Sequence, residues 1–141
     1  MITWFDESKF LSLHGLELGE YMHKVQESSF AGIDVHRARK LLLRAADDDY
    51  EQCVYAIWIA VRFKINGVCD AAIEFLKREA VSGGPRITVL RMLRDAADLT
   101  ASKIGEIEEI QFPREFIPAY DAFVTVLEEE IEILKGRVRL D

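Results

Sequence analysis

The chain has 141 residues, half of them hydrophobic, and a formal net charge of −7. This length fits one domain, and the hydrophobic content is enough to fill a core, which excludes global disorder. The acidic balance argues against nucleic acid as a partner, because phosphate binding requires a basic face.

The N-terminal segment has Asp6 and Glu7 where a secretory signal needs a basic region and an apolar run. We therefore expect a cytoplasmic protein. Cys53 and Cys69 lie in strongly apolar stretches, and without export they are expected to be buried free thiols rather than a disulfide.

Two helices are predicted in the first third of the chain. Asp6 offers N-cap chemistry for a helix over 6–27, whose apolar residues recur at helical spacing. Asp34 caps a second helix over 34–46, with Arg37, Lys40 and Arg44 on its outer face.

The most apolar stretch runs from Cys53 to Phe63 and has Arg62 as its single charged residue. It is too short for a bilayer, which needs about 20 apolar residues. A helix that is apolar on nearly every side belongs inside a bundle, so we expect a central helix over 50–65. Asn66-Gly67 is expected to stop it, and a further helix is predicted over 68–81.

Two long helices are predicted in the remainder of the chain. After Gly83-Gly84-Pro85, apolar residues from Leu90 to Ile107 form a heptad seam with Thr100 as its polar member, which predicts a helix over 86–109. A second seam predicts a helix over 114–135. The turn at Phe112-Pro113 would join them as an antiparallel αα-hairpin.

These elements predict an all-α fold, a single domain over 1–141 built as a bundle of five to six helices with a long C-terminal hairpin. A short helical-repeat array is the minor alternative, based on one loose match between the segments after Ala38 and Ala71.

No catalytic constellation is evident, and we expect no metal and no cofactor. The histidines lack zinc-motif spacing, and Glu20-x-x-His23 occurs once where a di-iron bundle needs two such motifs. Gly83-Gly84-Pro85 precedes a helix and has Arg86 beside it, but Pro85 removes one donor that an anion site would use.

Charge asymmetry is the remaining functional signal. Residues 100–135 carry nine acidic and three basic groups, a net charge of −6. We expect 128–130 and Glu132 to lie on the solvated face of the last helix. We expect basic residues of the second and fifth predicted helices to pair with this acidic hairpin inside the fold: Arg37, Lys40, Arg44, Arg86, Arg91 and Arg94.

The sequence therefore predicts a non-catalytic protein-binding module, an acidic inhibitor or adaptor of the immunity-protein or antitoxin type that blocks a basic partner surface. Exposed Ile110, Phe112 and Phe116 would add apolar anchors. The predicted partner-binding residues are Glu106, Glu108, Glu109, Phe112, Glu115 and Phe116.

Three alternatives remain open at this level. The pairs Glu17/Glu20, Glu106/Glu109 and Glu129/Glu132 have the spacing used by helical, magnesium-dependent nucleotide pyrophosphatases. The heptad seams would also serve self-assembly into a homodimer. Finally, the arginines of the second and fifth predicted helices would serve nucleic-acid binding if they were exposed.

Overall fold

The computed structural model describes residues 5–25, 50–62, 64–78, 81 and 83–138, and no β-strand occurs among them. The predicted all-α class is confirmed. The α-helices are α1 (Glu7–Ser12), α2 (Gly15–Lys24), α4 (Tyr50–Arg62), α5 (Val68–Leu76), α6 (Gly83–Met92), α7 (Ala101–Glu108) and α8 (Tyr120–Arg137), with 3-10 turns η2 (Leu93–Asp95) and η3 (Arg114–Phe116). The helix predicted over 34–46 lies outside the described residues.

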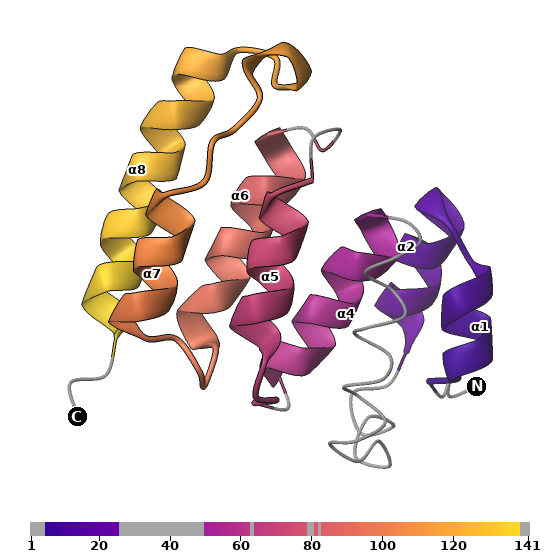
Figure 1. Ribbon diagram of the computed structural model, residues 1–141. Coiled ribbons are helices and arrows are strands. Elements are labelled where there is room, and N and C mark those ends of the chain that lie inside the picture. Colours follow the sequence, from indigo (N-terminus) through magenta and orange to yellow (C-terminus); the bar gives the residue numbers. More distant parts are fainter. Residues whose placement is uncertain (1–4, 26–49, 63, 79–80, 82, 139–141) are drawn as a thin grey trace.

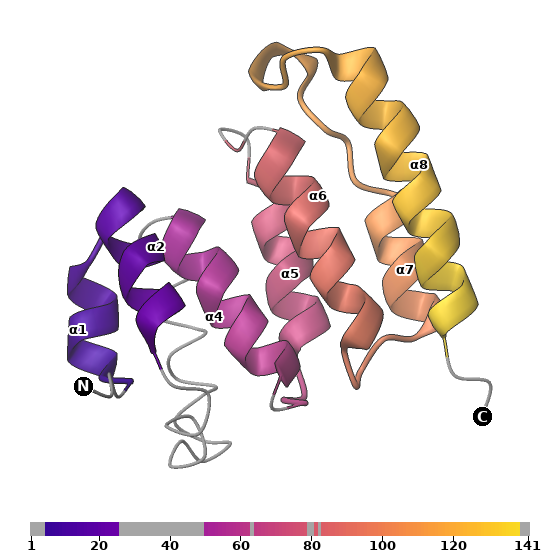
Figure 2. The ribbon, with the colours of Figure 1, turned by 180° about the vertical axis from the view of Figure 1, so that it is seen from behind.

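The helices form one bundle that is drawn out into a row in sequence order, from α1 and α2 at one end to α7 and α8 at the other (Figures 1 and 2). Helix length varies from six residues in α1 to 18 in α8. The segment after Ala38, on which the helical-repeat alternative depends, lies outside the described residues. The buried apolar residues nonetheless form one continuous core along the row.

The helix predicted over 6–27 is in fact two helices. Asp6 caps α1 as expected and accepts from the backbone N–H of Ser8 at 2.9 Å. The chain is then extended at Leu13 and His14. The freed carbonyls of Leu11 and Leu13 accept from Nε2 of the buried Gln52, at 2.9 and 2.8 Å, so a side chain of α4 stabilises the break.

Helix α4 confirms the predicted central helix, although it ends at Arg62. The amide of Lys64 donates to Val61 and that of Ile65 to Ala60, the two hydrogen bonds of a Schellman motif. Lys64 occupies the left-handed region with φ 54°. Gly67, with φ 96°, stands before α5 rather than ending α4.

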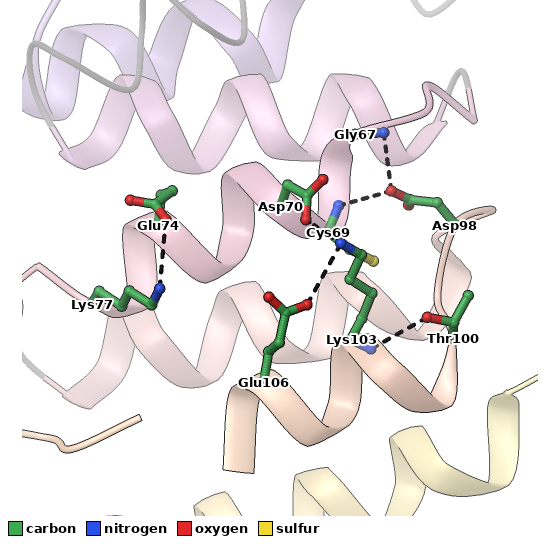
Figure 3. Close-up of polar contacts among 9 residues, drawn as sticks. All are labelled: Gly67, Cys69, Asp70, Glu74, Lys77, Asp98, Thr100, Lys103 and Glu106. Carbon is green, nitrogen blue, oxygen red and sulfur yellow. Dashed lines mark hydrogen bonds and ion pairs between the residues drawn. The ribbon is translucent and has the colours of Figure 1, made fainter. Parts of the chain in front are cut away.

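The helix predicted over 86–109 is broken into α6, η2 and α7. Thr100, predicted to be the polar member of a continuous seam, is instead the N-cap of α7 and accepts from the Lys103 amide at 3.2 Å. The Asp98 carboxylate accepts from the amides of Gly67 and Cys69 at 3.0 and 3.2 Å, across the start of α5 (Figure 3). These bonds need the non-helical turn that holds Asp98 before α7, which a continuous helix would not provide.

The C-terminal hairpin exists, but one of its arms is short. Helix α8 runs antiparallel to α7 and also lies along α6 (Figure 1). The described structure places its apolar stripe against the core of the same chain. The buried residues of α8 are Phe123, Leu127, Glu130, Ile131 and Leu134.

Candidate protein-binding surface

The six predicted partner-binding residues lie on one segment, from the end of α7 through η3, at the C-terminal end of the row (Figure 1). We call this segment, residues 106–116, the acidic tip. The four glutamates and Phe116 are exposed, and Phe112 is partly buried. The structure therefore keeps five of the six side chains accessible to a partner.

Phe112 is not the exposed anchor that the sequence predicted. Its ring meets the ring of Phe123 edge to face, with the centroids 5.4 Å apart, and the Arg86 guanidinium carbon lies 5.2 Å from its centroid. Ile110 is likewise partly buried against the core. Phe116, with 47% of its surface exposed, is the apolar side chain that the tip presents to solvent.

Basic side chains already neutralise two of the tip carboxylates. Lys103 binds both Asp70 of α5 and Glu106, whose carboxylate lies 3.5 Å from the ammonium (Figure 3). The hydrogen bond from Lys103 to Asp70 is the main cause that raises the pKa of this lysine. Glu108 lies 3.4 Å from Lys135 of α8.

Glu109 and Glu115 form no ion pair with any described residue, and both are exposed. Glu109 is the C-cap of α7, and Glu115 lies within η3 next to the exposed Phe116. Because their charge has no basic counterpart among the described residues, it remains available to an external cation. These two carboxylates and the ring are the part of the tip best suited to a basic protein.

Glu130 departs from the expected solvated face of α8, because it is only 4% exposed. Its carboxylate accepts from Arg91 Nε at 2.9 Å and from Arg94 Nη2. Burial alone would raise the pKa of Glu130, but the hydrogen bonds and positive charges of Arg94 and Arg91 outweigh it and lower the pKa. The predicted pairing of these two arginines with the hairpin is confirmed.

A sequence signal for the buried glutamate did exist. Leu127, Glu130, Ile131 and Leu134 follow the i, i+3, i+4, i+7 pattern of one helix face, which assigns Glu130 to the buried stripe. A buried carboxylate needs a cationic partner, and here Arg91 of α6 and Arg94 of η2 both bind it.

Arg86 does not join this network and is fully buried. Nε donates to the carbonyl of Val81 at 3.0 Å, Nη2 to that of Arg78 at 2.6 Å, and Nη1 to that of Leu76. Burial lowers the pKa of the guanidinium. The side chain therefore satisfies carbonyls at the end of α5 and in the following loop, and the idea that it assists an anion at Gly83-Gly84-Pro85 is wrong for this geometry.

Close packing explains why residue 83 is a glycine. A Cβ at this position would lie 3.0 Å from Phe123 Cδ2 and 3.4 Å from Ile117 Cγ2. The glycine thus permits close approach between the start of α6 and α8.

Side chains that could bind a metal do not converge in the described part of the chain. No three His, Cys, Asp or Glu side chains are placed there to hold a metal ion. Cys53 and Cys69 are free and buried, as predicted. Burial raises the pKa of Cys53 to about 11, and burial with the nearby Asp98 charge raises that of Cys69, so both thiols stay protonated at neutral pH.

The two described histidines lie at the surface. His14 and His23 are both exposed, and His36 lies outside the described residues. Glu20, which the sequence pairs with His23, is exposed as well.

Among the described helices, none combines the length and the apolar content that a membrane crossing requires. Comparisons of the chain with protein-family models, with curated proteins and with solved structures each find no match. Its function is therefore argued from the geometry of the surfaces described above.

Proposed function

We propose that the chain is a non-catalytic binding module that docks its acidic tip on a basic surface of another protein, in the manner of an immunity protein or antitoxin that blocks a basic site. The observation that carries this proposal is the exposed Phe116 ring on a segment that also holds the unpaired carboxylates of Glu109 and Glu115. An apolar anchor with charges at its rim is the usual anatomy of a small protein interface.

The rest of the tip supports the same use. Glu106 and Glu108 are half exposed, and their ion pairs with Lys103 and Lys135 are of the weak surface kind. A partner's arginine would therefore displace those lysines at low cost. The two free thiols fit a reducing compartment, so we place this activity in the cytoplasm.

A capture experiment with two matched baits tests the proposal. One bait carries Glu109→Lys, Glu115→Lys and Phe116→Ser, and the control carries Glu17→Lys and Glu20→Lys on the exposed face of α2. Both change the charge by the same amount. We expect the wild-type and control baits to capture the same basic protein from a host lysate in roughly stoichiometric amount, and the tip bait to lose it.

The captured protein is then purified and titrated against each variant. The tip variant should bind at least about 100-fold more weakly, corresponding to about 2.7 kcal/mol, and wild-type affinity should fall as salt rises from about 0.05 to 0.3 M. Circular dichroism should show equal thermal midpoints for all three proteins. Equal affinity of the tip variant and the control would show that the tip is not the binding surface.

A further inference from the structure

A groove lined by no residue of the acidic tip remains unexplained by the proposed function. It lies between α4 and α6 and has a volume of about 570 Å³. A smaller hollow of about 220 Å³ extends it toward α2, and the two share Trp58 and Met92 in their walls. Figure 2 shows α2, α4 and α6 as neighbours on this side.

The groove combines an apolar wall with a basic rim. Trp58 and Met92 are only partly buried, so their side chains line the opening, and Arg62 stacks over the Trp58 ring with its guanidinium carbon 5.3 Å from the centroid. Lys64 adds positive charge, and so does Arg91, which also binds Glu130 of α8. Among the described residues of the lining, Asp95 is the one acid. Such a lining favours an acidic segment that carries an apolar side chain.

The outer face of α8 has the complementary chemistry. Ile133 is 41% exposed, although it is a large hydrophobic residue on an otherwise polar face. Glu129, four residues before it, and the neighbouring Glu132 are exposed, and so is Glu128. Residues spaced by three and four lie on one helix face, so the three carboxylates form a stripe with Ile133 at its edge. Glu132 also lies 3.3 Å from the ammonium of Lys135 on the same helix.

We propose that this stripe of α8 docks in the basic groove of a second copy of the chain. The α8 of the same chain cannot fill the groove with this stripe, because its opposite face is fixed in the core through Leu127, Ile131 and Leu134. Arg91 already shows the pairing chemistry within one chain, since it binds Glu130 of α8 at 2.9 Å.

The contact is heterologous, because the groove and the stripe are different surfaces. Each chain then offers one of each, which gives a head-to-tail series or a ring rather than a two-fold dimer. A single groove of this size buries less than the roughly 1,200–2,000 Å² of a stable interface. We therefore expect weak association at high micromolar concentration that salt suppresses.

Sedimentation of two neutralised variants tests this directly. The groove variant is Arg62→Gln with Lys64→Gln, and the stripe variant is Glu128→Gln, Glu129→Gln and Glu132→Gln. The wild-type chain at about 0.5 mM in low salt should show an average mass that rises with concentration and returns to the monomer mass in about 0.5 M NaCl. Each variant alone should stay monomeric and folded by circular dichroism, although Arg62→Gln gives up the contact with the Trp58 ring and should lower the thermal midpoint slightly.

Mixing the two variants gives the decisive result. The intact groove of one accepts the intact stripe of the other, so the mixture should form a 1:1 dimer that grows no further. A control with Lys9→Gln and Lys77→Gln, two exposed lysines outside the groove, should associate as the wild type does. A monomeric wild type, a self-associating groove variant, or a monomeric mixture would each overturn the proposal. Glu132 of the stripe shares Lys135 with Glu108 of the acidic tip, whereas the groove variant touches no partner of the tip, so the groove variant separates this proposal from the proposed function.

Discussion

Replacing Arg86 should reveal how much of the stability depends on one buried cation. Its guanidinium donates to three carbonyls, and the bonds to Leu76 and Val81 are fully buried. A buried carbonyl left without a donor costs about 1–3 kcal/mol. Loss of the contact with the Phe112 ring adds about 0.5–1 kcal/mol.

For Arg86→Met these costs are offset in part, because a charge no longer has to be buried. We expect a net loss of about 3 kcal/mol from the free energy of unfolding. With a urea slope of about 2 kcal/mol/M, this moves the midpoint by about 1.5 M. Arg86→Lys keeps the charge but has a single ammonium for three carbonyls, so it should lose roughly half as much.

Urea titrations followed by circular dichroism measure both variants. Lys77→Met is the matched control, because it removes the same charge from an exposed side chain and should change stability by less than about 0.5 kcal/mol. If Arg86→Met is no more destabilising than this control, the three carbonyls do not depend on the guanidinium and the reasoning fails.

Three further predictions follow from single groups. Because Arg94 and Arg91 lower the pKa of Glu130, its stabilising contribution is present above the ordinary carboxyl pKa and is lost as pH falls through the lowered value. Glu130→Gln should therefore lower the thermal midpoint at pH 7, and its difference from the wild type should shrink as the pH is lowered below the ordinary carboxyl pKa. Burial raises the thiol pKa of Cys53 to about 11, and Cys69 is buried as well. Ellman's reagent should therefore label no thiol in the native protein and both cysteines in urea. Fast labelling of the native chain would contradict the buried placement. Ala119 has φ 53°, so Ala119→Gly should raise stability by about 0.5–1 kcal/mol in urea titration, and a loss would argue against backbone strain there.

The sequence by itself determined which segments are helical and which faces they bury. The stripe of Leu127, Ile131 and Leu134 and the apolar run of α4 are local patterns, and a helix that buries such a face is stable wherever it finds a neighbour. The capping role of Asp6 is equally local, because its acceptor and the donors it satisfies are two and three residues apart.

Only the tertiary structure decided where the helices break and which charges are buried. Gln52 binds carbonyls that lie 39 and 41 residues earlier, and Asp98 binds amides that lie 29 and 31 residues earlier. Backbone N–H and C=O groups can find hydrogen-bond partners either in a continuous helix or through these long-range side chains. The local pattern predicts the continuous helix, and the long-range bonds stabilise the break instead. The same holds for Glu130, which two distant arginines make a core residue.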